Sequence, residues 1–324
     1  MKFKIKPNVD KKKSESKYNK IIIDFNNLFY QKVIDETEKG LEGLYKGFVK
    51  NPYQALHEKV DSLVERFGYE TTEVYFLADN PNSVYYKRRE LDASYKHRRE
   101  QNFTTNFLNR SMDFAYLSLK QKSDRFVFAR IKEYEADDLV KPLIEILKPS
   151  YYNNVLLISN DMDWSRSVSD NVSWYNYREV MTKEAFFKKY KFFPNEESIK
   201  LFKSIHGDTS DSIPNAVPHL PEECLYHIIS NYNTLGSIWN NVPKDPKIPV
   251  HWKSKIMEAR ERIELSYQLV DFVPLDKNVL STHISYGKKN DLAFSYLSKI
   301  IDETYKVEKS KEKVSFFEKR IKIK

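Results

Sequence analysis

The sequence is poor in cysteine and glycine and has no long apolar run, and each shortage excludes a class of protein. The one cysteine, Cys224, cannot form an internal disulfide or a thiolate zinc cluster. The seven glycines make neither GxGxxG nor GxxxxGK, which excludes the common glycine-rich phosphate loops. No segment approaches the roughly 18 apolar residues of a membrane span, and the lysine-rich start lacks the apolar stretch of a signal peptide. We therefore expect a cytoplasmic protein without a membrane partner.

Basic and aromatic residues, by contrast, are abundant. The chain has 54 Lys+Arg against 46 Asp+Glu, a net charge of +8, which suits a polyanionic partner such as nucleic acid. Its 22 tyrosines and 20 phenylalanines can build a core and can also stack on bases. A length of 324 residues allows more than one hydrophobic core.

Short apolar runs in the first half predict β-strands. They are KIIID (20–24), EVYFLA (73–78), RFVFA (125–129) and NVLLIS (154–159). They alternate with segments of helical spacing such as residues 53–68, where Gly68 marks the end of a helix. This alternation indicates an α/β fold with a mostly parallel sheet flanked by helices. After about residue 181 the apolar spacing is helical, so we expect no further strands.

Composition also divides the chain into segments. We expect a lysine-rich tail at 1–19, an α/β core at 20–180, a helical region at 181–305 and a second basic tail at 306–324. Residues 84–124 form an insertion in the core with helical signals of its own. It contains YYKRRELDASYKHRR (85–99), where aromatic and basic residues alternate.

Carboxylates follow each predicted strand. They are Asp24 after the first run, Asp79 after the second, Glu135, Asp137 and Asp138 after the third, and Asp161 and Asp163 after the fourth. Parallel strands end at one edge of a sheet, so these acids should share a crevice. Crowded carboxylates need compensating charge, and an all-oxygen ligand set favours Mg²⁺ or Mn²⁺. A further pair, Asp208 and Asp211, lies in HGDTSDSIPNAV. Taken singly, each group could instead only start or cap a helix.

The order of these segments carries a family resemblance. IDFNN, FLADNPNSVYYKRRELDASYKHRR, YEADDLV, LLISNDMDW and HGDTSDSIPNAV together resemble the flap endonuclease or 5′-nuclease superfamily, most closely the bacteriophage 5′→3′ exonucleases of the phage ribonuclease H type. The resemblance covers residues 20–218 and continues more weakly to about 305. It implies a PIN-like core, a helical arch or gateway formed by the insertion, and a helical duplex-binding region. The implied activity is metal-dependent hydrolysis of phosphodiesters at 5′ ends or flaps of DNA, or in RNA primers, during replication or repair.

The resemblance also implies roles for single residues. It assigns a first Mg²⁺ or Mn²⁺ to Asp24, Asp79, Glu135 and Asp137, with Asp138 close by, and a second to Asp161, Asp163 and Asp211, with Asp208 nearby. Two such ions would clamp the scissile phosphate, lower the pKa of a bound water and stabilise the leaving oxygen. Lys96 resembles the family's lysine that approaches the scissile phosphate. We expect phosphate contacts from Arg88, Arg89, Arg98 and Arg99, and base stacking from Tyr95.

Three alternatives stay open: a PIN-like ribonuclease, a non-catalytic nucleic-acid-binding protein on the same scaffold, and an unrelated basic protein with surface acids. The basic insertion and helical second half disfavour the first, and the filled acidic positions disfavour the second. The stretch NAVPHLPEECLYHII lacks the glycine-rich turn with which many relatives bind duplex phosphate. We expect a monomer that binds DNA with 5′ ends or flaps, or an RNA–DNA hybrid. The C-terminal tail contains VSFFEKRI, in which Phe316 and Phe317 either pack on the helical region or dock into a replication protein. If the chain is viral, it would act in an infected host cell.

Overall fold

The computed structural model describes residues 16–31, 52–79, 86–93, 95, 112–113, 115–293, 295–296, 299 and 303. The expectations for most of both basic tails and for much of the insertion therefore lie outside the described residues. Of the expected nucleic-acid contacts, Lys96, Arg98 and Arg99 lie outside them too, and the side chain of Arg89 is not described.

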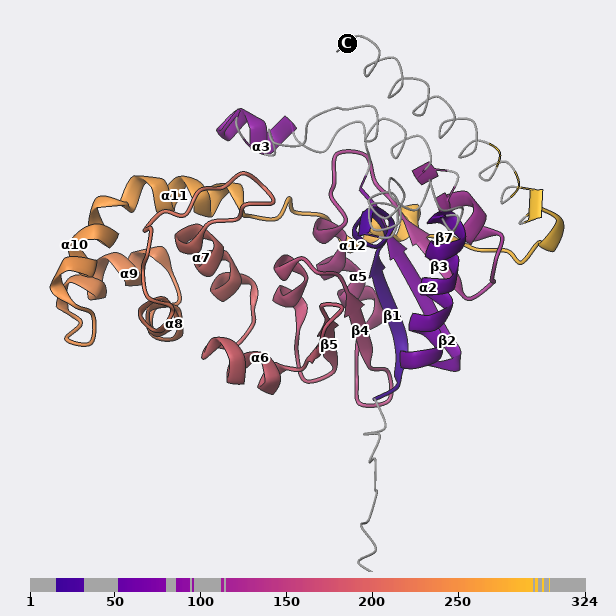
Figure 1. Cartoon of the computed structure of the whole chain (residues 1–324), viewed down its shortest axis with the longest axis horizontal. Helices are drawn as coiled ribbons and strands as arrows, with labels where there is room; N and C mark the ends of the chain where they lie inside the picture. Colours follow the sequence, from indigo (N-terminus) through magenta and orange to yellow (C-terminus); the bar gives the residue numbers. More distant parts are fainter. Residues whose placement is uncertain are drawn as a thin grey trace, which may run out of the picture.

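A seven-stranded sheet forms the centre of the fold, in the order β6-β5-β4-β1-β2-β3-β7 (Figure 1). The inner strands are β1 (Tyr18–Asp24), β2 (Gly68–Leu77), β3 (Phe126–Ala129), β4 (Val155–Ile158) and β5 (Val172–Tyr175), and their pairings are all parallel. Two short strands, β6 (Val180–Met181) and β7 (Ser285–Tyr286), pair antiparallel at the edges. The prediction of a mostly parallel sheet is confirmed.

The expectation that strands stop near residue 181 is wrong in one respect. β7 returns from the second half of the chain and pairs Ser285 and Tyr286 with β3. A strand of two residues is too short to show alternation in the sequence. Its pairing depends on the rest of the fold, which brings this segment beside β3.

Helices cover both faces of the sheet. Ile21 and Ile23 pack with α2 (Pro52–Phe67) and with helical residues 115–120, whereas Ile22 belongs to the core on the other face, with α5 (Val140–Leu147). Successive strand residues point to opposite faces, so a strand buried on both sides reads as an unbroken apolar run. The helix that was predicted to stop at Gly68 ends at Phe67.

The second half of the chain is mainly helical. Its elements are α6 (Lys183–Tyr190), α7 (Glu196–His206), α8 (Glu222–Asn231), α9 (Leu235–Asn241), the 3₁₀ turn η3 (Val242–Lys244), α10 (Val250–Glu258), α11 (Arg260–Leu269) and α12 (Lys277–His283). The apolar spacing stays helical through α10 and α11, but the structure divides them at Ala259, whose ψ of 4° lies outside the helical region. None of the helices in the described part of the chain is long and apolar enough to cross a membrane.

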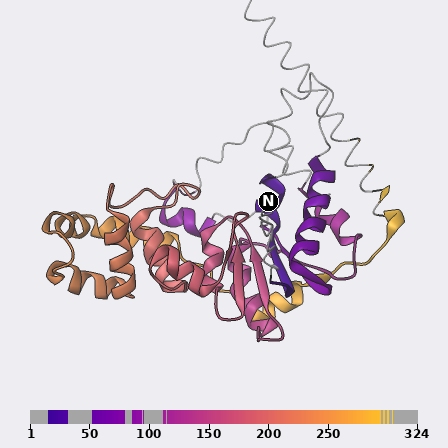
Figure 2. The same ribbon diagram turned by 60° about the horizontal axis from the view of Figure 1, so that its bottom comes forward.

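The helical region extends to one side of the sheet, beyond β5 and β6 (Figure 2). Its buried residues, among them Leu201, Ile228 and Ile263, belong to the same apolar cluster as Ile22 and Leu157 of the sheet. α11 packs along α7, and α12 packs against α5. The two parts therefore share a continuous core, with the carboxyl ends of the strands beside their junction.

Candidate active site

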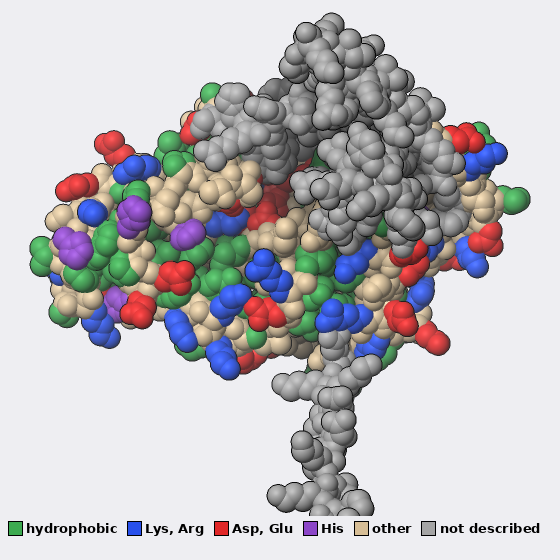
Figure 3. Space-filling view, in the orientation of Figure 1, with side chains coloured by type: hydrophobic (Ala, Val, Ile, Leu, Met, Phe, Trp, Pro, Cys, Tyr) green, Lys and Arg blue, Asp and Glu red, His purple; other side chains and the backbone are tan. Residues whose placement is uncertain are grey.

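The acids that follow the strands lie together. Figure 3 shows acidic side chains gathered near the middle of one face, between the sheet and the helical region. Two groups each bring carboxylate oxygens within 4.8 Å of one another. The first consists of Glu135, Asp137 and Asp138, and the second of Asp161, Asp163 and Asp208. The predicted convergence at one edge of the sheet is confirmed within each group for the acids that follow strands, and Asp208, which follows α7, joins the second group.

Asp79 lies beside the first group, and Asp24 lies near Asp79 and Asp161. Asp24 ends β1 and is 8% exposed. Its carboxylate accepts hydrogen bonds from the Ser159 hydroxyl (2.8 Å) and the Asn27 N–H (2.9 Å). Asp79 accepts from the Ala136 N–H (2.8 Å), which joins the end of β2 to the segment that holds the first group. Burial, reinforced by the charge of Asp79, raises the pKa of Asp24 to about 7.

The first group lies at the 3₁₀ turn η1 (Asp137–Leu139), which leads into α5. No side chain caps this turn, so N-capping does not explain its acids. Asp138 accepts from the backbone N–H of Glu135 (3.0 Å) and of Val273 (2.8 Å). Burial and the neighbouring acids raise the pKa of Asp137 well above its usual value. Burial also raises the pKa of Asp138, to about 6, although Arg88 opposes the shift. Such crowded acids would be stabilised by a cation.

Arg88 and Tyr95 turn toward these acids. Arg88, from α3 (Tyr86–Leu91), donates to Glu135, to Asp138 (3.2 Å) and to the carbonyl of Asp271 (2.8 Å). Tyr95 is 2% exposed, and its hydroxyl donates to Asp211 (3.2 Å). In this conformation neither side chain presents a free face, so the expected phosphate contact and base stacking would each require it to move.

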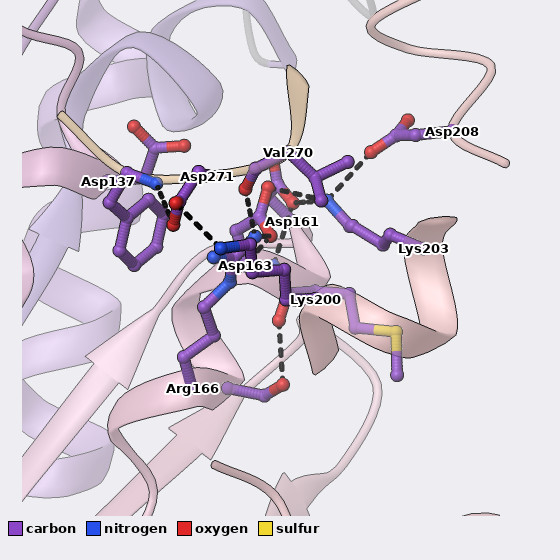
Figure 4. Close-up of polar contacts among 12 residues, drawn as sticks. Asp137, Asp161, Asp163, Arg166, Lys200, Lys203, Asp208, Val270 and Asp271 are labelled. Carbon is purple, nitrogen blue, oxygen red and sulfur yellow. Dashed lines mark hydrogen bonds and ion pairs between the residues drawn. The ribbon is translucent and has the colours of Figure 1, made fainter. Parts of the chain in front are cut away.

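The second group surrounds a lysine (Figure 4). The turn η2 (Met162–Ser167) follows β4, and Asp161 caps it by accepting from the Asp163 N–H (2.9 Å). Lys203 of α7 reaches in from the helical region and places its ammonium between Asp161, Asp163 and Asp208. Burial alone would raise the pKa of Asp163, but Arg166 and Lys203 outweigh it and hold that pKa below its usual value.

The structure exchanges the places expected for Asp208 and Asp211. The resemblance grouped Asp211 with Asp161 and Asp163, whereas the structure brings Asp208 to them and directs Asp211 to Tyr95. The backbones of Asp208 and Ile213 form an isolated antiparallel bridge, so the two aspartates lie on a tight loop. The position of each aspartate along this loop determines which carboxylate faces Asp161 and Asp163.

Sequence reasoning missed the groups that hold the acids in place. The Asn26 side chain accepts from the Asp79 N–H, and the Ser159 hydroxyl donates to Asp24. Arg166 donates to Asp163, and Lys203 pairs with the second group. One signal was present for Lys203. It interrupts the apolar side of α7 near Phe202 and Ile205 and is itself buried. A charged residue on a buried helix face needs a partner, but the sequence does not say which.

Both groups suit a divalent cation by the chemistry of their donors. They offer only carboxylate oxygens, the ligands that Mg²⁺ and Mn²⁺ prefer. At the first group, burial raises the pKa of Asp137, and the charges of Asp138 and Glu135 add to the effect, which a bound cation would offset.

Comparisons with known proteins agree with this arrangement. The family described as "5′-3′ exonuclease, N-terminal resolvase-like domain" matches residues 19–191, more than half of the chain, and the chain belongs to this family. A curated relative, the flap endonuclease of Escherichia phage T5, is 26% identical over 220 residues, which cover 65% of this chain and 73% of the relative.

Solved structures share the fold. The phage T5 D15 protein co-crystallised with metal ions has a TM-score of 0.59 and 19% identity, covering 89% of this chain and 99% of that one. The T5 5′-exonuclease with bound zinc has a TM-score of 0.57 and 21% identity, covering 90% and 99%. The catalytic core of Rad2 in complex with DNA has a TM-score of 0.50 and 12% identity, covering 88% of each chain. The expected PIN-like, 5′-nuclease fold is confirmed.

Proposed function

We propose that this protein is a metal-dependent 5′→3′ exonuclease and flap endonuclease that hydrolyses phosphodiesters at 5′ ends or flaps of DNA, and in RNA primers, during replication or repair. The observation that carries the proposal is the meeting of carboxylates that follow β3 and β4 in two tight groups, with Asp79 at the end of β2 bonded to the segment that holds the first group and Asp24 of β1 close to Asp79. Membership of the 5′-3′ exonuclease family supports it. So do the relative named a flap endonuclease and the similar structures with metal ions and with DNA.

Two divalent ions, Mg²⁺ or Mn²⁺, are part of the proposal. The first would be held by Asp24, Asp79, Glu135, Asp137 and Asp138, and the second by Asp161, Asp163 and Asp208, with Asp211 nearby. Bound there, the ions would supply Lewis acidity and charge neutralisation for phosphodiester hydrolysis. The chain's own part is positioning, because Ser159 and the Ala136 N–H hold Asp24 and Asp79 in fixed orientations.

Substrate binding is assigned to the insertion and to the helical region. Lys96 would approach the scissile phosphate, and Arg89, Arg98 and Arg99 would contact neighbouring phosphates. The helical region would hold duplex DNA beside the acids. The protein would act as a monomer in the cytoplasm, with the basic segment 306–324 available to replication proteins.

Single carboxylate variants test the proposal. In Glu135→Gln and Asp161→Asn we expect single-turnover cleavage of 5′-flap, nicked and RNA-primed duplexes to fall by roughly 100-fold or more, because each loses a ligand charge but keeps its size. Asp211→Asn should be milder. Thermal melting should change little in Asp161→Asn, because Lys203 keeps two other carboxylates, and excess chelator should abolish wild-type cleavage.

Asp245→Asn is the matched control. Asp245 is buried, but it lies away from both groups and bonds to His227 and Tyr232 (both 2.6 Å). Its loss should lower stability while leaving the cleavage rate near that of the wild type. Wild-type rates in Glu135→Gln and Asp161→Asn, or full cleavage in chelator, would contradict the proposal. Cleavage of single-stranded RNA in place of flapped DNA would favour a PIN-like ribonuclease.

A further inference from the structure

Lys203 occupies the centre of the second acidic group. Its Nζ lies 2.6 Å from Asp163 Oδ2, 2.7 Å from Asp208 Oδ2 and 3.1 Å from Asp161 Oδ1, and the residue is 4% exposed (Figure 4). These are three charge-assisted contacts to three separate carboxylates. The ammonium donates hydrogen bonds to Asp161 and Asp163 and forms an ion pair with Asp208.

A divalent ion at this group would need the same place. The three carboxylates offer oxygens within 4.8 Å of one another, and Mg²⁺ binds oxygen at about 2.0–2.1 Å. The ion would therefore lie between these oxygens, where the ammonium now lies. Two cations at such a separation repel strongly in a site shielded from water. The ion and the ammonium cannot hold the same three carboxylates together.

A displaced Lys203 ammonium has an alternative carboxylate nearby. Its side chain is long and flexible, and Asp211 lies three residues beyond Asp208 on the same tight loop. The carboxylate of Asp211, which accepts from the Tyr95 hydroxyl, offers a partner outside the group. Lys200, one turn earlier on α7, differs because its ammonium pairs with Asp271 (2.6 Å), outside both acidic groups.

We infer that Lys203 is a built-in counter-ion of the second acidic group, and that a divalent ion binds there only by displacing its ammonium. The inference rests on the proposed function, since it takes the second group to be a metal site. In the absence of the ion, Lys203 keeps three mutually repelling carboxylates assembled. In its presence, the displacement weakens binding of the ion and so sets the concentration at which the second site fills.

Manganese binding measured by electron paramagnetic resonance tests this directly. Wild type should bind two Mn²⁺ ions, one of which is lost in Asp161→Asn. In Lys203→Met the affinity of that same ion should rise at least tenfold, while the other ion binds as in the wild type. Lys200→Met removes an equally buried lysine from the same helix and should leave both affinities unchanged.

Two results distinguish a failure of the counter-ion inference from a failure of the proposed second metal site. If wild type binds two ions and Lys203→Met binds the second no more tightly, the counter-ion inference is overturned and the metal site stands. If no ion is lost in Asp161→Asn, the proposed second metal site falls and the inference falls with it.

A measurement on the wild type tests the inference even if Lys203→Met does not fold. With ¹⁵N-labelled lysine, the caged Lys203 ammonium should give a slowly exchanging NMR signal, assigned by its absence in Lys203→Arg. Saturating Mg²⁺ should shift or remove that signal. A signal unchanged by Mg²⁺ at saturation would overturn the displacement.

Discussion

At the scale of single residues, both buried arginines at the site pair with acids of the two groups. Arg88 pairs with Glu135 and Asp138, and Arg166 pairs with Asp163. Breaking such a pair leaves an uncompensated charge, which usually costs more than the pair contributes. Replacing Arg88 or Arg166 would therefore disturb both stability and the positions of the carboxylates.

A half-buried histidine away from the acids shows the opposite case, a group held neutral. His57 of α2 lies 2.9 Å from the Ser118 hydroxyl. Burial lowers its pKa to about 4, and the charge of Lys122 adds to the effect. In the unfolded chain histidine titrates near pH 6.5. Between these values the unfolded state binds more protons, so stability is complete above about pH 6.5 and is lost as the pH falls toward 4.

We predict that His57→Gln removes this part of the pH dependence. Relative to the variant, wild type should lose about 2 kcal/mol of unfolding free energy between pH 7 and pH 4.5. Urea unfolding at several pH values measures the difference. His251→Gln, at an exposed position in α10, should follow the wild-type curve. Parallel curves for wild type and His57→Gln would show that folding does not lower the pKa of His57.

At the scale of elements, the end of α7 decides where Asp208 points. Gly207 follows the helix with a φ of 85°, and a Cβ at this position would lie 2.6 Å from the Asn215 nitrogen and 2.7 Å from the Pro214 carbonyl carbon. Both contacts are with backbone, which cannot move aside as a side chain can. Glycine is therefore required for the turn that brings Asp208 to Lys203.

Gly207→Ala should accordingly destabilise the protein by about 2 kcal/mol or more and weaken manganese binding at the second group. Gly236→Ala is the matched control, because α9 is helical there and the new Cβ would meet only the Thr234 hydroxyl at 4.0 Å. That change should be neutral or stabilising by about 0.5–1 kcal/mol. Equal melting temperatures for the two variants would refute the argument from the backbone.

At the scale of the whole molecule, residues 270–273, which we call the strap, connect the helical region to both acidic groups. The Val270 carbonyl accepts from Arg166 (2.6 Å), the Asp271 carbonyl accepts from Arg88, and the Val273 N–H donates to Asp138. The guanidinium of Arg166 also lies 4.0 Å from the centre of the Phe272 ring. The strap thus contacts partners of both groups where α11 returns to the core.

We predict that Phe272→Ala slows cleavage more than it weakens DNA binding. Without the ring, Arg166 is less fixed and Asp163 less well placed, so the single-turnover rate should fall on the order of tenfold. Duplex affinity, measured by fluorescence anisotropy, should stay within about twofold of wild type. Phe193→Ala, which removes a half-exposed ring packed on Phe187, should change neither quantity. A loss confined to affinity would make the strap part of the DNA-binding surface.

Much of the architecture could be predicted from the sequence because it depends on local pattern. The runs around Ile22, Phe76, Phe128 and Leu157 are short and apolar throughout, which is how a strand buried on both faces reads. Parallel strands then require that acids at their ends meet at one edge. The mostly parallel sheet, the helical second half and the clustering of Glu135, Asp137, Asp161 and Asp163 follow from these two rules.

The tertiary structure alone decided how the acids are paired and held. Lys203 and Asp163 are 40 residues apart in the chain, and Arg88 and Asp271 are 183 apart. Contacts across such separations depend on how α7, α3 and the strap pack against the core, and no periodicity encodes that. The choice of Asp208 over Asp211 depends on the turn at Gly207. A buried charge without a partner is unstable, so burial favours pairs of opposite charge. The packing of the elements determines which oppositely charged side chain lies close enough to form the pair.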